Sequence, residues 1–163
     1  MQKDISALAL EMTAFYEGSL HDINHFLKVW AYARMIGGRE LPDDESRAVL
    51  EAAAVLHDIA CPLCREKYGR ARGDLQEAEG MPMAEKLLSK LGFGADFIAK
   101  VVWLVGHHHT LSDVNTPEHR ILLEADYLVN ADEAGHSEAQ LRSAEKSIFR
   151  TATGTALLKS IYG

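Results

Sequence analysis

Histidines and aspartates recur in this chain in short patterns that suit metal binding. The stretch SLHDINHFLKVW contains a His-Asp pair, His21-Asp22, followed by His25. A second pair, His57-Asp58, comes at the end of the apolar stretch AVLEAAAVLHDIA. Titratable groups beside an apolar helix face are costly unless something compensates them, and a divalent ion does so by binding imidazole and carboxylate directly. The alternative is an ordinary helix end, where the dipole favours histidine and the aspartate faces solvent.

Asp126 lies in a similar setting, in the stretch RILLEADYLVN. Its neighbours three and four positions away in the sequence are Leu122, Leu123, Val129 and Asn130. Residues at this spacing share one helix face, so Asp126 is expected on the apolar stripe and Glu124 elsewhere. A carboxylate on such a stripe must be neutralised or bound. The alternative is a buried acid paired with an arginine.

His25 is the inward-facing member of the first group, because Phe26, Val29 and Trp30 follow it. The alternative for a single inward histidine is a core residue hydrogen-bonded to a carbonyl. Ser19 and Asp22 form an S-x-x-D signature for the start of a helix. Asp22 is therefore expected to act as a capping acid, or to orient a ligand imidazole from behind.

Three expected helices thus carry four nitrogen and oxygen ligands: His25, His57, Asp58 and Asp126. Such a set suits a divalent Mn, Fe, Mg, Co, Ni or Zn ion. The order H…HD…D on a helical scaffold resembles the HD superfamily of metal-dependent phosphohydrolases, over residues 19–135. The resemblance rests on HDINHFLKVWAYA, AAAVLHDIA and LLEADYLVN.

The resemblance implies hydrolysis of a phosphomonoester or phosphodiester, with a nucleotide or related small phosphorylated metabolite as substrate. It makes the four residues the ligands of one ion, with a second ion as an alternative, and makes Asp58 a candidate proton acceptor. His21 and Lys28 become candidate substrate contacts. Many members have arginine where this chain has Lys28, and lysine offers a point charge in place of a bidentate fork. Two other functions stay open: a di-iron oxygenase of the same fold, and a non-catalytic metal- or ligand-binding module.

Three consecutive histidines, His107, His108 and His109, end the apolar stretch ADFIAKVVWLV. HD proteins commonly direct histidines from this region to a second metal, a bridging water or the substrate phosphate. His107 and His108 are therefore predicted as catalytic residues, and His109 is predicted to point away. The alternative is a polar helix end.

The number of metal ions depends on ligands between the second pair and this triplet. Two-ion members usually have a further histidine there, and this chain has none. Only Glu77 or Glu79 is considered as a substitute, so the sequence favours a single ion.

A locally basic stretch, CREKYGRARGD, follows the second His-Asp pair and is expected to be a loop. Arg65 and Lys67 are predicted to hold an anionic substrate, and the alternative is a solvated loop. Cys61 and Cys64 supply too few ligands for a structural zinc site and are interpreted as incidental thiols.

Apolar residues recur at helical spacing almost throughout, which predicts an all-α, single-domain HD-type bundle of about seven or eight helices over residues 1–163. Helices at 137–162 are expected to pack on the part that bears the motifs. The first three expected helices cover Asp4 to Glu17, the stretch after Ser19 up to Gly37-Gly38, and the stretch after LPDDES up to Pro62. A fourth ends at Gly92, a fifth ends near Gly106, and a sixth is opened by Thr116-Pro117. One or two short helices close the chain.

Composition limits the classes of partner. The 163 residues are 47% hydrophobic and 25% charged, which is typical of a soluble globular protein. A net charge of −7 disfavours binding to nucleic acid polymers, while a small anionic substrate can still bind in a cleft of opposite local charge. No uncharged run reaches membrane-spanning length, and two cysteines cannot staple a secreted fold of this size. A cytoplasmic location is expected, and the oligomeric state stays open.

Overall fold

The structure is a computed structural model that describes residues 4–114 and 116–163. This part of the chain forms helices and no strands, which confirms the all-α prediction. The helices are α1 Ile5–Phe15, α2 Leu20–Glu40, α3 Asp44–Leu56, α4 Cys61–Tyr68, α5 Gly73–Lys90, α6 Ala95–Val105, α7 Pro117–Ala134, α8 Glu138–Ser147 and α9 Ala152–Tyr162.

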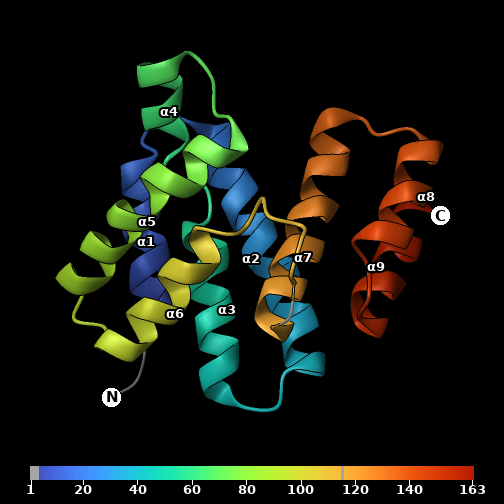
Figure 1. The fold of residues 1–163 in the computed structure, drawn as a ribbon, viewed down its shortest axis with the longest axis horizontal. Helices are drawn as coiled ribbons and strands as arrows, with labels where there is room; N and C mark the ends of the chain where they lie inside the picture. The colour runs from blue at the N-terminus through green and yellow to red at the C-terminus, as the bar shows by residue number, and fades with distance from the viewer. Residues whose placement is uncertain (1–3, 115) are drawn as a thin grey trace.

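Three central helices, α2, α3 and α7, pack against one another and form the middle of the molecule. On one side, α1 and α6 pack on α3, and α5 packs on α6. On the other side, α9 packs on α2 and α7, and α8 packs on α9 (Figure 1). Two of the predicted metal ligands lie in α2 and α7, and the other two directly follow α3. The third helix ends at Leu56, so its predicted extension to Pro62 was wrong.

The helix α4 covers the first part of the stretch CREKYGRARGD that was expected to be a loop, so the prediction was wrong for this part, and residues 69–72 are not helical. Pro62 stands in its first turn, and Gly69 ends it in the left-handed conformation, with φ 77°. Both are ordinary signals for the start and end of a helix. The second half of α4 consists of charged and polar residues, so apolar residues do not recur at helical spacing and do not predict this helix.

The helix α2 passes through Gly37 and Gly38 and ends at Glu40, so the predicted end at the glycine pair was also wrong. A Cβ atom on Gly37 would lie 2.7 Å from Leu50 Cδ2 of α3. Glycine at this position therefore lets two central helices approach closely. The helix ends just before Pro42, which disfavours helical conformation in the residue before it.

The helix α7 begins as predicted, with Thr116 accepting a hydrogen bond from the backbone N–H of His119. Most of its residues are buried, because α2, α3 and α9 surround it. Glu124 is directed toward α9, where its carboxylate accepts hydrogen bonds from Arg150 N at 2.9 Å and Thr151 N at 3.1 Å. This buried acid fixes the C-terminal helices to α7.

None of the helices in the described residues combines the length and the apolar content needed to cross a lipid bilayer.

Candidate metal centre

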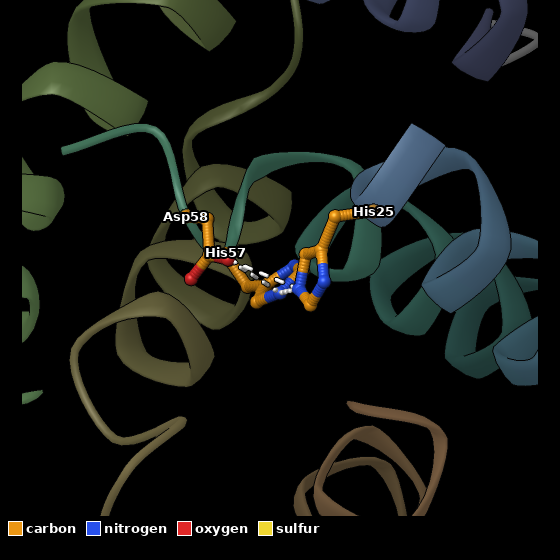
Figure 2. A group of neighbouring side chains, drawn as sticks. All are labelled: His25, His57 and Asp58. Atoms are coloured by element: carbon orange, nitrogen blue, oxygen red, sulfur yellow. Dashed lines mark hydrogen bonds and ion pairs between the residues drawn. The ribbon is translucent and has the colours of Figure 1, made fainter. Parts of the chain in front are cut away.

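The four predicted ligands meet between the central helices, although they span a hundred residues of sequence. His25 comes from α2, His57 and Asp58 follow the end of α3, and Asp126 comes from α7. The Nε2 atoms of the two histidines are 3.1 Å apart. Figure 2 shows the side chains of His25, His57 and Asp58 directed toward one another.

Both carboxylates contact both imidazoles. Asp58 Oδ2 lies 3.1 Å from His25 Nε2 and 3.3 Å from His57 Nε2. Asp126 Oδ1 lies 3.2 Å and 3.3 Å from the same two nitrogens. Donor atoms bound to one ion at about 2.0–2.3 Å lie about 3–3.5 Å apart, so these separations fit a shared cation.

The far nitrogens of the two histidines set which atom each imidazole presents. His57 Nδ1 lies 2.7 Å from the carbonyl oxygen of Ala54, and a carbonyl only accepts, so Nδ1 is the donor. His25 Nδ1 lies 2.7 Å from Glu133 Oε1. In their neutral forms both rings therefore present the lone pair of Nε2 to the centre, which is the form that binds a metal.

Asp126 Oδ1 provides an independent test of this fit. The atom is buried and has no hydrogen-bond partner among the described residues. An ionised carboxylate oxygen in that state is costly unless a cation binds it. The donor set of two imidazoles and two carboxylates suits a divalent ion of the first transition row or Mg²⁺.

The pKa values of the cluster show the same need for positive charge. Burial alone would raise the pKa of Asp126 and Asp58, but the adjacent histidines hold both well below the ordinary range. Burial alone would lower the pKa of His25, but its contacts with the carboxylates of Asp126 and Asp58, which accept from a protonated ring, outweigh burial and raise the pKa to about 10. The buried Asp126 and the half-buried Asp58 thus need cationic partners, and a divalent ion also meets that need.

Comparison with known proteins agrees with this geometry. The family model described as HD domain matches residues 22–131. The chain belongs to the HD domain family. This confirms the resemblance that the motifs indicated, and the family match includes all four residues of the cluster.

Two solved structures share the fold of this HD domain. A predicted HD superfamily hydrolase from an uncultured Thermotogales bacterium is 28% identical, with a TM-score of 0.69, and the match covers 98% of this chain and 83% of that chain. YpgQ of Bacillus subtilis is 18% identical, with a TM-score of 0.61, over 97% and 88% of the two chains.

Curated relatives are similar over part of the HD domain. A bifunctional uridylyltransferase/uridylyl-removing enzyme of Burkholderia vietnamiensis is 37% identical over 82 residues, which are 50% of this chain and 8% of that protein. The Burkholderia mallei enzyme of the same name is 41% identical over 66 residues, which are 40% of this chain and 7% of that protein. This chain therefore matches less than a tenth of the length of these relatives.

Glu133 belongs to the site of this HD domain and was not predicted. Its carboxylate contacts His25 Nδ1 at 2.7 Å and 3.0 Å and lies 3.8 Å from His21 Nε2. Glu133 follows Asp126 by seven residues, about two helical turns, so it lies near the same face of α7. That spacing was an available signal. His21, predicted as a substrate contact, has a side chain 72% exposed and lies at the rim beside Glu133.

The histidine triplet is arranged differently from the prediction. His108 is buried, with Nε2 3.4 Å from Asp58 Oδ1. His107, predicted at the site, stacks on Trp103 at 4.0 Å between ring centroids and binds the Trp103 carbonyl through Nδ1. His109, predicted to point away, lies with His108 and Asp58 in a second group of potential metal ligands. The reason is that α6 ends at Val105, so the triplet follows a turn and loses the helical spacing.

Neither glutamate considered for a second ion takes that role. Glu77 Oε2 accepts hydrogen bonds from His109 N at 3.0 Å and Thr110 Oγ1 at 2.8 Å. Glu79 pairs with Lys67 at 2.8 Å. The side chain that faces the histidines is Gln76, which no motif indicated. Burial and the neighbouring His108 lower the pKa of His109 to about 4.

Two of the predicted substrate-binding cations, Arg65 and Lys67, are already paired. Arg65 donates to both carboxylate oxygens of Asp22, at 2.9 Å and 3.0 Å, and this pair joins α4 to α2. Lys67 binds Glu79, as described above. Lys28 is exposed on α2, one turn after His25.

The capping role predicted for Asp22 was wrong. Ser19 does precede the first residue of α2, but its side chain makes no capping hydrogen bond. Its hydroxyl instead donates to Asp22 Oδ2 at 2.7 Å. Asp22 therefore serves Ser19 and Arg65 and does not complete a capping box.

Cys61 and Cys64 are buried free thiols at the start of α4. Burial, assisted by the charge of Asp58, raises the pKa of Cys61. A protonated thiol is a poor nucleophile and a poor metal ligand. The pair therefore has the properties expected of incidental thiols.

Proposed function

We propose that this HD domain is a metal-dependent phosphohydrolase that hydrolyses a phosphoester of a nucleotide or a related small phosphorylated metabolite. The observation that carries the proposal is the convergence of two imidazole nitrogens and two carboxylates, with Asp126 Oδ1 left without a hydrogen-bond partner. The names of the relatives support a phosphoester: one is a hydrolase of this superfamily, and others include uridylyl-removing activity.

His25, His57, Asp58 and Asp126 would hold the ion. When bound, a divalent ion supplies Lewis acidity, which lowers the pKa of water and polarises a phosphoryl oxygen. Asp58 has one oxygen, Oδ2, in the ligand cluster and the other, Oδ1, facing His108. Oδ1 is therefore placed to accept the proton of an attacking water, with His108 beside it to take or return that proton.

The rim of the site offers charge for an anionic substrate. His21 and Lys28 both lie on α2 and are exposed, one on each side of His25 in the sequence. Arg65 could bind a phosphate only if it first released Asp22. Arg65 therefore remains a candidate for substrate recognition, with Asp22 as its partner in the absence of substrate. Lys67 is expected to contribute less, because Glu79 holds it at 2.8 Å.

A second candidate function is a di-iron oxygenase, which needs about six protein ligands. The second group, Asp58 with His108 and His109, favours this alternative, since it adds two imidazoles and shares Asp58 with the first group. The same arrangement also suits a hydrolase with two ions.

The test is metal analysis of the purified protein, followed by a screen for phosphate or nucleotide release over nucleotides and small phosphoesters. Phosphate-ester hydrolysis that depends on added divalent metal supports the proposal. Two irons per chain with oxygen uptake, and no hydrolysis, would replace it with the oxygenase. Bound metal with neither reaction would leave a binding module.

A further inference from the structure

Gln76, in the first turns of α5, is buried and has its side-chain amide fixed in one orientation. Its Nε2 atom donates to the carbonyl oxygen of Ala71 at 2.5 Å. Because a carbonyl only accepts, the amide nitrogen must point to Ala71 and the amide oxygen must point the other way. That oxygen faces the histidine turn that follows α6.

The amide oxygen contacts two adjacent imidazoles. Gln76 Oε1 lies 2.8 Å from His109 Nε2 and 3.4 Å from His108 Nε2. The short contact requires a proton on His109 Nε2, since the amide oxygen cannot donate. His108 has its proton on the other nitrogen, because Nδ1 lies 2.7 Å from the Val105 carbonyl. The two neighbouring histidines are thus held in opposite tautomers.

The start of α5 holds His109 from two further sides. Glu77 accepts from the backbone N–H of His109, and a Cβ atom on Gly73 would lie 3.0 Å from His109 Cγ. Glycine therefore leaves room for the ring, and Glu77 fixes the backbone that carries it. If these contacts served only to attach the histidine turn to α5, the hydrogen bond from the His109 backbone N–H to Glu77 would be sufficient.

We propose that Gln76 is a positioning residue, which holds His109 as the Nε2–H tautomer and keeps His108 and His109 directed toward Asp58. The inference rests on the proposed function, since it concerns the same site. It assigns to His108 the free Nε2 beside Asp58 and to His109 a free Nδ1. Partners that orient the groups of a metal site typically change its metal affinity or activity by about 10–100-fold when they are removed.

The test compares Gln76→Ala and Gln76→Glu with the wild type, using ¹⁵N NMR of the histidine rings in the full chain, with and without Zn²⁺. We expect His109 to be the Nε2–H tautomer in the wild type and to become a mixture of tautomers in Gln76→Ala. Gln76→Glu keeps an acceptor oxygen for His109 but loses the donor to Ala71, so the Nε2–H tautomer should stay the major form there, with a smaller shift than in Gln76→Ala. At a given Zn²⁺ concentration, the ring signals of His57 should be the same in the wild type and in both variants. Glu85→Ala, an exposed position on α5, is the matched control.

Turnover is measured on the same samples together with metal content. We expect Gln76→Ala to lower kcat by about 10–100-fold at unchanged metal content, with little change in KM. A His109 tautomer that does not respond to Gln76→Ala would overturn the inference. Wild-type protein without phosphohydrolase activity but with the tautomer shift would refute the proposed function and retain the role of Gln76.

Discussion

Glu133 lies 2.7 Å from Nδ1 of His25, on the side of the imidazole opposite to the contact between Nε2 and Asp126. The carboxylate fixes the ring and its proton, so Nε2 is available as a ligand. We therefore predict that Glu133→Ala weakens metal binding by about 10–100-fold and that Glu133→Gln, which keeps an acceptor oxygen, weakens it less. Competition with a chelating dye measures the affinities.

The control for this prediction is Asp132→Ala, which removes an exposed acid from the next position on α7. Its metal affinity should match the wild type within a factor of about two, since general electrostatic attraction between exposed charges is weak. Equal losses in Glu133→Ala and Asp132→Ala would show that Glu133 contributes only long-range charge.

Asp58 and Asp22 each directly follow a histidine, but their contacts differ, so alanine substitutions at the two positions should affect metal binding differently. Asp58→Ala should abolish metal binding and activity, because it removes a carboxylate of the cluster. Asp22→Ala should retain metal and lower the free energy of unfolding by only about 0.2–1 kcal/mol, since its partner Arg65 is 45% exposed. Metal analysis and urea denaturation measure both effects. Loss of metal in Asp22→Ala would contradict the assignment.

Metal binding should stabilise the folded chain, because the ligand cluster exists only when the helices are assembled. At a free metal concentration 100 times the Kd, the expected gain is about 2.7 kcal/mol. For a chain of this length, that gain raises Tm by about 5–10 °C. Thermal unfolding with Mn²⁺, and after addition of a chelator, checks the effect. The Asp126→Asn variant should show no increase in Tm when Mn²⁺ is added. If its Tm still rises, Asp126 is not a ligand.

The histidines after α6 should differ sharply in their effect on turnover. His108→Ala should lower kcat by about 10²–10⁴-fold with the metal content of the first group retained, because His108 faces Asp58 Oδ1. His107→Ala should leave kcat nearly unchanged, because that ring stacks on Trp103. Steady-state kinetics on samples of known metal content separates the two. A larger loss in His107→Ala than in His108→Ala would reverse the assignment.

The ligand cluster was accessible from sequence because His25 and Asp126 lie in helices with clear apolar spacing, and His57 and Asp58 directly follow a third such helix. His25 and Asp126 both fall on apolar stripes, and the spacing of such stripes predicts which side chains point inward. The family resemblance then associated stretches that are far apart in the chain. The helical fold was predictable for the same reason.

The residues that support the cluster were not accessible in this way. Gln76 meets His109 across 33 positions, and local spacing says nothing about such a partner. Glu133 meets His25 across 108 positions, and its spacing from Asp126 places it on the right face of α7 without indicating that partner. The directions of His107 and His109 depend on the turn that follows α6. The end of this helix was predicted near Gly106, but the conformation of the turn was not predictable from apolar spacing. Because the chain leaves the helix after Val105, His109 faces the site and His107 stacks on Trp103, the reverse of the prediction.

Crystals of the protein soaked with Mn²⁺ or Zn²⁺, with anomalous diffraction recorded at the metal edge, give the most direct test of the central claim. We predict an anomalous peak within about 2.0–2.3 Å of His25 Nε2, His57 Nε2, and one carboxylate oxygen of each of Asp58 and Asp126. A fully soaked crystal with no peak between these four residues, or with its only peaks elsewhere, would contradict the account.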